Sequence, residues 1–446
     1  MSAVAAQSLL RACPGSPLRG HVAVPGDKSI SHRSMLIGAI CDGETHVTGF
    51  GRSADTEATI AAVRALGVDV YEHGADTLRV FGKGLRGLRA PGRPIDCANA
   101  GTLVRLIAGI LAGQDGESFE LTGDESLSQR PMGRIAEPLA RMGARLETTD
   151  GRLPMMVSGG ALHAIDYALP VASAQVKSAI LLAGLFADGE TTVVEPAPTR
   201  DHTERMLQAA GADVAVRSTS VTVRPAERLS LGEVEVPGDF SSAAPFIVAA
   251  TLVQGSELHV HGVNLNPRRT GLLEILDRMG ANVTVYNRRS IGGEPGGDLE
   301  IHSAPLVGTT VGTKDVPLAI DELPLFALAA ACARGESVLR GAEELRAKET
   351  DRIEATVDAL RPLGARARAN EDGFSITGVP ARLRGGRIDS RGDHRIAMLG
   401  AVAGLASREG VRIEGADVVG VSFPAFFEIV EQLRRSTRGQ RQWSEP

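Results

Sequence analysis

Aromatic residues are scarce in this chain, and the scarcity argues against one class of partner. Only 3% of the 446 residues are aromatic, and one of them is a tryptophan. Proteins that bind nucleic acid commonly combine a basic surface with aromatic stacking platforms. The formal net charge here is −6. We therefore expect no nucleic-acid partner, and any anionic ligand must be held by a local cluster of basic residues.

The chain also lacks paired cysteines and long apolar segments. Its four cysteines, Cys13, Cys41, Cys97 and Cys332, include no C-x-x-C spacing, which favours a reduced, cytoplasmic protein. The longest apolar runs, 243–253 and 323–333, span 11 residues each. A membrane span needs about 20. We therefore expect these runs to be buried helices or strands, without a role at a membrane.

The two ends of the chain differ in composition from the rest. The first twenty residues contain arginine and serine but no acidic residue, which fits either a frayed terminus or a targeting segment. The last thirteen residues (434–446) are polar and include Trp443. We expect this tail to be disordered and Trp443 to lie outside the core.

A sequence pattern recurs along the chain in which a glycine ends a predicted helix and a predicted strand follows. Apolar residues at helical spacing precede Gly67, Gly143, Gly211, Gly280 and Gly364, and a strand-like segment follows each. Glycine suits a helix C-terminus where the backbone turns left-handed. The intervals of 76, 68, 69 and 84 residues leave room for about four strands and two helices. The sequence therefore predicts one α/β unit copied several times.

Two similar turns add a second level of repetition. The segment VPGDKSISHRS (24–34) returns 212 residues later as VPGDFSSAAPF (236–246). Each turn precedes an apolar helix, which Asp27 or Ser29 could cap in the first copy and Asp239 or Ser241 in the second. The pattern predicts a duplicated two-domain α/β protein with its ligand between the halves. Only the first copy carries basic residues, so we expect Phe240 and its neighbours to serve packing.

Polar or charged residues open several apolar helices. Helix N-termini present free N–H groups and a positive dipole end, so they bind phosphates and carboxylates. Each stretch is equally compatible with an ordinary helix cap or a solvated charged surface. The candidate residues are Lys28, Ser29, Arg33, Gly101, Arg130, Ser173, Gln175, Lys177, Arg200, Asp321, Glu322, Lys348, Glu349, Arg352, His394 and Arg395.

The pair Asp321 and Glu322 stands at the edge of a strongly apolar run. Burial raises the pKa of a carboxyl group, which makes a general base one interpretation and a helix cap the other. Known metal-binding, Walker and nucleophile-elbow motifs are absent from the sequence. We therefore expect neither a metal site nor a covalent nucleophile.

Nine motifs stand in the order found in the 5-enolpyruvylshikimate-3-phosphate synthase family. They are PGDKSISHR, NAGT…R, RPMGR, SAQVKSA, TRDHTE, IDELP, KETDR, DHRIAM and SFPAFF. From about residue 20 to residue 433 the chain resembles that family. The resemblance implies an α/β fold of two similar domains, each made of three βαβαββ repeats in an inside-out barrel, with the active site in the interdomain cleft. The domains would be residues 1–24 with 238–446, and residues 25–237.

The resemblance also implies a reaction. The enolpyruvyl group of phosphoenolpyruvate would move to the 5-hydroxyl of shikimate 3-phosphate by addition and elimination, with release of phosphate. This step belongs to the shikimate pathway of aromatic amino acid biosynthesis and needs no metal or organic cofactor. Each substrate carries roughly three negative charges. A monomer is implied, with glyphosate as a possible inhibitor.

Site residues follow from the resemblance motif by motif. Those implied for shikimate 3-phosphate are Lys28, Ser29, Arg33, Ser173, Ala174, Gln175, Arg200, Asp321 and Lys348. Those implied for phosphoenolpyruvate are Lys28, Gly101, Arg130, Gln175, Arg352 and Arg395. Asp321 would be the base for the hydroxyl. Glu349 and Lys28 would transfer protons at the methylene carbon, with the division among the three left open.

Some positions depart from the family's patterns. Val421 and Ser422 stand where some members have a lysine before the final FP motif, so one basic contact is missing. SAQVKSA and TRDHTE look more like the glyphosate-insensitive branch, which often has alanine in place of Gly101.

Two other functions fit the sequence less well. The related enolpyruvyl transferase for UDP-N-acetylglucosamine carries a Lys-Asn pair where this chain has Lys28 and Ser29. A non-catalytic binding scaffold is the second alternative, against which the presence of both Asp321 and Glu349 argues.

Overall fold

The chain forms two compact units in the structure, a computed structural model that describes residues 9–12, 14, 16–379 and 382–441. Unit 1 comprises Met1–Val24, Gly238–Arg289 and Pro295–Pro446. Unit 2 comprises Pro25–Pro237 and Ser290–Glu294. The short segment Ser290–Glu294 departs from the division expected from the sequence, because it belongs to unit 2 although the residues on both sides of it belong to unit 1.

Unit 2 contains three four-stranded sheets, and all three follow one pattern. Their orders are β14-β3-β5-β4, β6-β7-β9-β8 and β10-β11-β13-β12. In each sheet the first pair is parallel and the other two pairs are antiparallel. The strands are β3 (Asp42–Thr48), β4 (Asp69–His73), β5 (Thr77–Lys83), β6 (Ile95–Asp96), β7 (Ser118–Thr122), β8 (Arg145–Thr149), β9 (Arg152–Ser158), β10 (Asp166–Ala168), β11 (Thr191–Val194), β12 (Val214–Val216), β13 (Ser220–Val223) and β14 (Glu233–Glu235).

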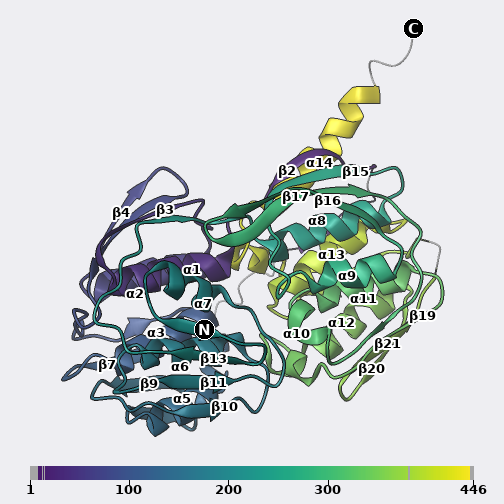
Figure 1. The fold of residues 1–446 in the computed structure, drawn as a ribbon. Helices are drawn as coiled ribbons and strands as arrows, with labels where there is room; N and C mark the ends of the chain where they lie inside the picture. Colours follow the sequence, from purple (N-terminus) through teal and green to yellow (C-terminus); the bar gives the residue numbers. More distant parts are fainter. Residues whose placement is uncertain (1–8, 13, 15, 380–381, 442–446) are drawn as a thin grey trace, which may run out of the picture. The chain divides into compact units, whose positions relative to one another are not determined.

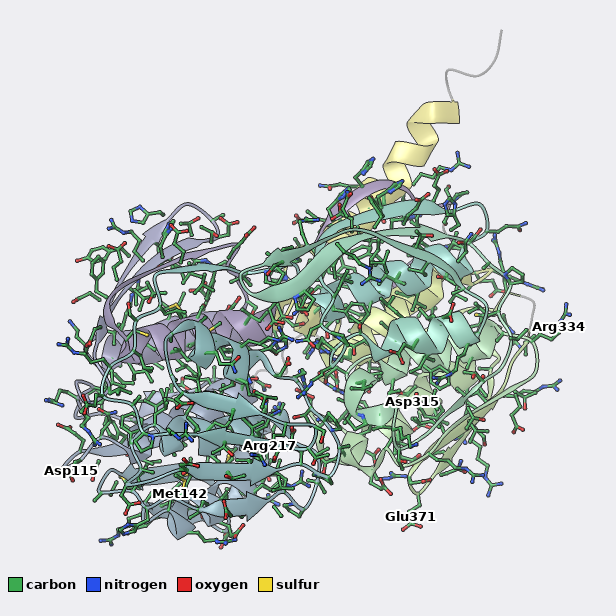
Figure 2. All side chains as sticks on the ribbon, in the orientation of Figure 1. Asp115, Met142, Arg217, Asp315, Arg334 and Glu371 are labelled. Atoms are coloured by element: carbon green, nitrogen blue, oxygen red, sulfur yellow. The ribbon has the colours of Figure 1, made fainter. Side chains whose placement is uncertain are left out.

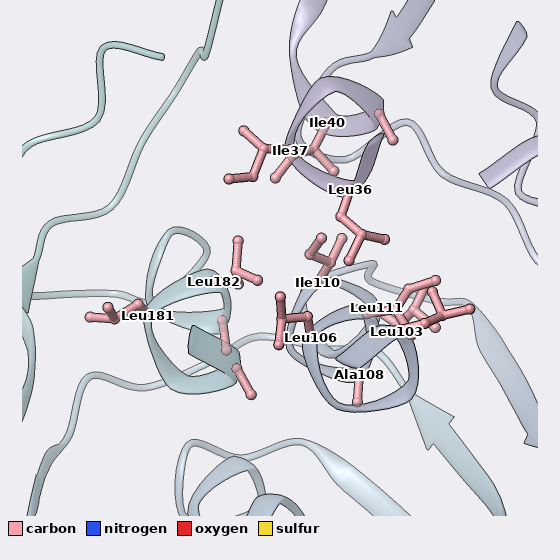
Figure 3. Packing of buried hydrophobic residues seen from close by; sticks show 14 of the residues in the cluster. Leu36, Ile37, Ile40, Leu103, Leu106, Ala108, Ile110, Leu111, Leu181 and Leu182 are labelled. Carbon is pink, nitrogen blue, oxygen red and sulfur yellow. The ribbon is translucent and has the colours of Figure 1, made fainter. Parts of the chain in front are cut away.

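Three of the helices of unit 2 form its buried core. They are α1 (Lys28–Ile40), α2 (Ala54–Ala65), α3 (Gly101–Ala112), α4 (Glu125–Ser128), α5 (Gly133–Arg141), α6 (Ala174–Gly184) and α7 (His202–Ala209). Helices α1, α3 and α6 are buried on nearly all sides, as expected for apolar helices without a polar stripe. Figure 3 shows their side chains, among them Leu36, Leu106 and Leu182, gathered in the space between the helices. This core fixes where the three helices begin.

Unit 1 repeats the arrangement with strands from both ends of the chain. Its sheets have the orders β16-β17-β15-β2, β18-β19-β21-β20 and β1-β23-β22. The strands are β1 (Leu9–Ala12), β2 (Arg19–Ala23), β15 (Glu257–Asn264), β16 (Asn282–Ile291), β17 (Glu294–His302), β18 (Thr310–Val311), β19 (Glu336–Leu339), β20 (Arg366–Asn370), β21 (Gly373–Thr377), β22 (Gly386–Asp389) and β23 (Val411–Glu414). Segment Ser290–Glu294 therefore forms the tip of the β16–β17 hairpin.

Helices α8, α11 and α13 of unit 1 are buried like α1, α3 and α6 of unit 2. The helical elements are α8 (Phe240–Leu252), α9 (Gly271–Arg278), α10 (Val316–Ala319), α11 (Leu323–Cys332), α12 (Arg352–Leu360), α13 (His394–Ala406), α14 (Phe426–Arg441) and the 3₁₀ helices η1 (Glu343–Ala347), η2 (Arg361–Leu363) and η3 (Ala416–Val421). Exposed charged side chains such as Arg334 and Glu371 extend from the surface of this unit (Figure 2).

The element order confirms the predicted repeat. The chain runs β10-α6-β11-α7-β12-β13, which is one βαβαββ unit (Figure 1). The run from β6 to β9 has the same order with the short helix α4 inserted before α5, and the run from β18 to β21 has it with the short elements α10, η1 and η2 added. The first repeat of each unit takes its parallel strand from elsewhere in the sequence. Strand β14 pairs with β3, and β2 pairs with β15. Unit 2 thus holds three full repeats, whereas unit 1 holds two full repeats and a third whose sheet, β1-β23-β22, has three strands among the described residues.

The glycines of the recurring sequence pattern confirm the predicted helix ends. Gly67, Gly143, Gly211, Gly280 and Gly364 all have left-handed backbones, with φ between 86° and 97°. An L side chain is disfavoured in this region. The sequence pattern therefore located five helix-to-strand junctions from backbone requirements alone.

The structure corrects the expectations for both ends of the chain. Strand β1 (Leu9–Ala12) pairs with β23, so residues 9–12 are not a frayed terminus. Helix α14 continues to Arg441, so the expected disorder of residues 434–446 is wrong as far as that residue. Cys13 and Trp443 lie outside the described residues. Cys41, Cys97 and Cys332 are free thiols.

Both long apolar runs are buried helices, α8 and α11. Within the described part of the chain, none of the helices combines the length and apolar character that crossing a membrane requires.

Candidate active site

The first Pro-Gly-Asp turn places a lysine and an arginine at the start of α1. Asp27 caps the helix by accepting a hydrogen bond from the backbone N–H of Ile30 at 3.1 Å, which settles the choice between Asp27 and Ser29. Lys28 Nζ lies 2.7 Å from Asp55 Oδ2 on α2. This ion pair holds the Lys28 ammonium group in a defined position at the start of α1.

Arg33 lies one helical turn further along α1 and is almost completely buried. Its guanidinium donates from Nε to Thr203 Oγ1 at 2.7 Å, from Nη2 to Ser178 Oγ at 3.0 Å and from Nη1 to the Ser29 carbonyl at 2.9 Å. Burial, together with the positive charge of Arg200, lowers the pKa of Arg33 to about 10. The predicted basic residues Arg33 and Arg200 are therefore close enough to repel each other, as expected where an anion is to be bound.

Helices α3 and α6 meet at their first turns through Gln175. Its side-chain amide donates to Thr102 Oγ1 at 3.0 Å and accepts from Arg105 Nη1 at 2.8 Å. Gly101 is the first residue of α3. A Cβ atom added there would lie 2.8 Å from Arg105 Nη1 and 3.0 Å from Arg130 Nη1. The predicted residues Gly101, Arg130 and Gln175 thus share one neighbourhood.

The loop before α5 contributes Arg130 to this neighbourhood. Its Nη2 donates to Asn99 Oδ1 at 2.7 Å, and Asn99 in turn donates to Asp124 at 2.8 Å. The hydrogen bonds hold the guanidinium near the start of α3. Arg105 is a residue that the sequence analysis missed as a site residue, although its position four residues after Gly101 places both on one helix face.

The motif SAQVKSA divides into residues of different roles. Ser173 is the N-cap of α6 and accepts from Val176 N at 3.4 Å, and Ala174 begins the helix. Lys177 does not join the other candidates, because its ammonium group is buried between the carboxylates of Glu195 and Glu204. Lys177 is therefore an internal ion-pair partner and not a candidate ligand for substrate.

A second cluster lies in unit 1 around Arg352, the first residue of α12. Arg352 Nε donates to Asp393 Oδ2 at 2.7 Å, and Nη2 donates to Glu349 Oε2 at 2.5 Å. Asp321 Oδ1 lies 3.5 Å from Nη1. Burial lowers the pKa of Arg352, but the three carboxylates outweigh it and raise that pKa above its usual value. The predicted residues Asp321, Glu349 and Arg352 are therefore brought together.

Two further arginines surround Asp321. Arg269 Nη1 lies 3.6 Å from Asp321 Oδ2 and 3.1 Å from Glu322 Oε1, and Arg395 Nη2 lies 3.9 Å from Asp321 Oδ2. Three guanidinium groups therefore lie within ion-pair distance of the Asp321 carboxyl group. The sequence pointed only to an apolar neighbourhood for Asp321, whereas the structure surrounds it with basic groups. Arg269 was missed by the sequence analysis and lies just before α9.

The second Pro-Gly-Asp turn is not reserved for packing, which corrects an expectation. Phe240 is fully buried, as predicted. Asp239 caps α8 and lies 3.6 Å from Arg269. Ser241 accepts hydrogen bonds from Arg395 Nη2 at 3.1 Å and from Arg269 and donates one to Glu322. Since the arginines come from other segments, the turn sequence itself could not reveal this charged neighbourhood.

Lys348 and His394 occupy the predicted helix starts. Lys348 ends η1 just before α12, and its side chain is half-buried. His394 opens α13 and is buried behind the cap residue Asp393. Ser422, which precedes the final FP motif, is the residue that ends η3.

One group of side chains has the spacing of metal ligands. Asp201, His202 and Glu294 offer ligand atoms that all lie within 4.8 Å of one another. Arg205 Nε lies 3.1 Å from Asp201 Oδ1 and 3.7 Å from Glu294 Oε2. The carboxylates thus already face a fixed cation, and the group is better described as an ion-pair cluster that joins α7 to the β16–β17 tip.

A comparison with protein families identifies the chain. Residues 13–430 match the family model described as EPSP synthase (3-phosphoshikimate 1-carboxyvinyltransferase). The chain belongs to the EPSP synthase family. It is 52% identical over 419 residues to the 3-phosphoshikimate 1-carboxyvinyltransferase of Acidithiobacillus ferrooxidans, which covers 94% of this chain and 96% of that protein. The protein of the same name from Alkalilimnicola ehrlichii is 51% identical, with 93% of both chains covered.

Two solved structures share the fold. The EPSP synthase of Acinetobacter baumannii matches with a TM-score of 0.86 and 45% identity, covering 96% of this chain and 98% of that one. The enolpyruvyl transferase NikO of Streptomyces tendae matches with a TM-score of 0.77 at 19% identity, which speaks for the fold alone. The predicted family and fold class are thereby confirmed.

Proposed function

We propose that this member of the EPSP synthase family transfers the enolpyruvyl group of phosphoenolpyruvate to the 5-hydroxyl of shikimate 3-phosphate and releases phosphate. The observation that carries the proposal is that each unit gathers its motif residues at the starts of buried helices. Arg33 and Gln175 lie in such a cluster in unit 2, and Arg352 lies in one in unit 1. Cationic groups at helix N-termini suit substrates that carry phosphate and carboxylate groups.

Shikimate 3-phosphate is assigned to the residues around α1, α6 and Arg200. Arg33 and Arg200 would supply the positive charge, and the hydroxyl groups of Ser29 and Ser173 would bind the ring oxygens. Ala174, Gln175, Lys28, Lys348 and Asp321 complete the proposed set. The lowered pKa of Arg33 supports this assignment, because the two neighbouring arginines would be stabilised by a bound anion.

Phosphoenolpyruvate is assigned to arginines that hydrogen bonds or ion pairs already hold in place. Arg130, Arg352 and Arg395 are the proposed main ligands, with Lys28, Gln175 and the open space at Gly101. Arginine suits this task because its planar group grips phosphate and carboxylate through paired hydrogen bonds. Asp393 and Glu349 hold Arg352 in place without substrate, which reduces the ordering that binding requires.

Asp321 is the proposed base. The 5-hydroxyl attacks C2 of phosphoenolpyruvate and gives its proton to the Asp321 carboxylate, while the methylene carbon C3 gains a proton. In the second step the C2–O bond to phosphate breaks, C3 loses a proton and the double bond returns. Glu349 and Lys28 are proposed for the transfers at C3. The position of Asp321 among three arginines supports this proposal, because the arginines would place an anionic substrate beside the carboxyl group.

Phosphate release with purified protein tests the function. We expect release when shikimate 3-phosphate and phosphoenolpyruvate are both present and none when either is omitted. Replacement of shikimate 3-phosphate by UDP-N-acetylglucosamine should abolish the signal. Turnover of the nucleotide sugar, without turnover of shikimate 3-phosphate, would refute the proposal in favour of the related transferase.

The proposal extends to the setting of the enzyme. Each unit is taken as one enolpyruvyl transferase domain, and the protein as a cytoplasmic monomer. The buried free thiols of Cys41 and Cys97 support a reducing compartment. Glyphosate is proposed as an inhibitor that competes with phosphoenolpyruvate near Gly101. Sedimentation with and without both substrates would test the monomer.

A further inference from the structure

A buried trio of charged residues in unit 2 has no role in the proposed chemistry. Lys177 Nζ on α6 lies 2.6 Å from Glu204 Oε1 on α7 and 3.0 Å from Glu195 Oε2 just after β11. The side chains are 0%, 1% and 2% exposed, respectively. We call Lys177, Glu195 and Glu204 the ionic trio. Its formal charge is one negative, because two carboxylates face one ammonium group.

Stability alone gives a weak reason for such an arrangement. Removing charges from water is costly, and well-packed apolar side chains in place of a buried ion pair are often as stable or more so. Buried charges can instead fix one arrangement of the surrounding elements, which is a hypothesis to be argued for each protein. The question is what the ionic trio holds in place.

The residues next to the ionic trio both contact Arg33. Ser178 follows Lys177 on α6, and Thr203 precedes Glu204 on α7. Ser178 Oγ and Thr203 Oγ1 lie 2.7 Å apart, and each accepts a hydrogen bond from the Arg33 guanidinium. A shift of α7 against α6 would therefore separate the two acceptors that orient Arg33.

The third member of the ionic trio acts on the segment that leads to Arg200. Glu195 Oε1 accepts from Thr199 N at 3.2 Å and from the Thr199 hydroxyl. Thr199 is the residue before Arg200. The ammonium group of Lys177 thus links α6, α7 and the Arg200 segment at one point.

The charges of the neighbourhood agree with this geometry. Arg33 is faced by the like charge of Arg200, and by the carboxylates of Glu204, Asp27 and Glu294. Glu294 reaches the cluster from the β16–β17 tip and pairs with His202 at 2.8 Å. In the absence of an anion, these carboxylates offset the repulsion between the two arginines.

We propose that the ionic trio positions Arg33 and Arg200 for shikimate 3-phosphate, so that Lys177, Glu195 and Glu204 are positioning residues of this binding site. The inference rests on the proposed function, since it takes these arginines as the ligands of that substrate. Phosphoenolpyruvate is assigned mainly to other arginines. Loss of the Lys177–Glu204 ion pair should therefore weaken the binding of shikimate 3-phosphate more than the binding of phosphoenolpyruvate.

Two variants distinguish the effect of the α6–α7 ion pair from the effect of the net charge of the ionic trio. Lys177→Met with Glu204→Gln removes the α6–α7 ion pair but keeps the formal charge of the trio at one negative, carried by Glu195. Glu204→Gln alone makes the trio neutral but keeps an oxygen for Lys177. Arg224→Met with Glu190→Gln is the matched control, because that pair lies 2.7 Å apart on the exposed surface of the same unit.

Calorimetric titration with shikimate 3-phosphate is the main measurement. For the Lys177→Met, Glu204→Gln protein we expect a dissociation constant about tenfold higher than that of the unmodified chain, as for loss of one charge-assisted contact. The KM for phosphoenolpyruvate should change less than about twofold. The surface control should match the unmodified chain. Equal affinity for shikimate 3-phosphate in all three proteins would overturn the inference.

A background without Arg33 distinguishes positioning from a general structural effect. In an Arg33→Met protein, the Lys177→Met, Glu204→Gln change should lower the affinity for shikimate 3-phosphate by less than about a further twofold. The reason is that both sets of substitutions act through the same residue, Arg33. A full additional tenfold loss would show that the ionic trio acts elsewhere. No binding to the unmodified chain would overturn the proposed function itself, and the inference with it.

The Glu204→Gln protein gives a readout that does not depend on the double variant folding. Removal of the Glu204 charge leaves Asp27 and Glu294 to oppose Arg200 at Arg33. Because Lys177 keeps an oxygen partner on α7, the link between the helices is retained, and the dissociation constant for shikimate 3-phosphate should rise less than about threefold. A loss of about tenfold would contradict the inference, because it would show that the charge of Glu204, and not the link between the helices, governs binding.

Discussion

Arg352 and Asp393 form a buried ion pair in which Nε donates to Oδ2 at 2.7 Å. Asp393 has a second task, since its Oδ1 caps α13 by accepting from the backbone N–H of Arg395 at 2.8 Å. One carboxylate therefore fixes both a proposed phosphoenolpyruvate ligand and the start of the helix that carries another. The pair explains how an arginine can be held ready for substrate inside an apolar unit.

Asp393→Asn separates these two tasks. Asparagine keeps an oxygen for the helix cap but loses the charge that orients Arg352. We expect the KM for phosphoenolpyruvate to rise about tenfold, in line with loss of a charge-assisted hydrogen bond, with a nearly unchanged KM for shikimate 3-phosphate. Steady-state kinetics would measure both. Asp393→Ala, which also removes the cap, should lower the melting temperature further. A lower KM in Asp393→Asn would instead mean that the carboxylate competes with substrate.

Gly101→Ala tests the space beside α3. The added Cβ would lie 2.8 Å from Arg105 Nη1 and 3.0 Å from Arg130 Nη1, and both guanidinium groups are tied to Gln175 or Asn99. Glyphosate is a longer anion than phosphoenolpyruvate and should suffer more from the crowding. We expect its inhibition constant to rise at least about tenfold, with a smaller rise in the KM for phosphoenolpyruvate. Equal inhibition constants in the two proteins would remove the proposed overlap.

Asp321→Asn tests the proposed base. The amide has the shape of the carboxylate but cannot accept the hydroxyl proton, so kcat should fall by about a hundredfold or more. Binding of shikimate 3-phosphate, measured by calorimetry, should change far less. Asp358→Asn is a suitable control, because Asp358 also pairs with two arginines but is exposed. A near-normal kcat in Asp321→Asn would assign the proton transfer to another group.

The sequence was most informative where local chemistry decides the structure. Gly67 and its four counterparts mark helix ends because a left-handed backbone demands glycine, and Asp27 caps α1 because its side chain reaches a free N–H group. The recurring sequence pattern therefore predicted the repeats. The motif residues followed from the family resemblance, and the fold brings Gly101 near Arg130 as well as Arg352 near Asp321.

Long-range pairing was beyond the sequence. Arg269 stands 53 residues from its partner Glu322, and no local pattern distinguishes it from Arg268. Lys177 had the appearance of a site residue because it follows Gln175 in a motif, yet helical geometry turns it toward Glu204. The assignment of Ser290–Glu294 to unit 2 depends on tertiary contacts such as His202 with Glu294. These contacts join segments that lie far apart in the sequence, and no sequence pattern indicates which segments will meet.

His32 provides a test of stability against pH. It lies on α1 within the first motif, is fully buried, and its Nδ1 is 2.6 Å from Thr59 Oγ1. Burial lowers its pKa to about 3, although Asp55 raises it in part. The ordinary value in an unfolded chain is about 6.5. Below pH 6.5 the unfolded chain therefore binds a proton that the folded chain refuses, so acid favours unfolding.

The stability contributed by neutral His32 is present above pH 6.5 and is lost as the pH falls toward 3. At pH 5 the loss from this residue should be about 2 kcal/mol. Urea unfolding at pH 7.5 and pH 5 would measure it, with His32→Asn as the comparison, because asparagine retains a polar group for Thr59 but does not titrate. The variant should lose about 2 kcal/mol less between the two pH values. The same loss in both proteins would mean that His32 takes up its proton without unfolding the chain, and that other groups govern the acid sensitivity.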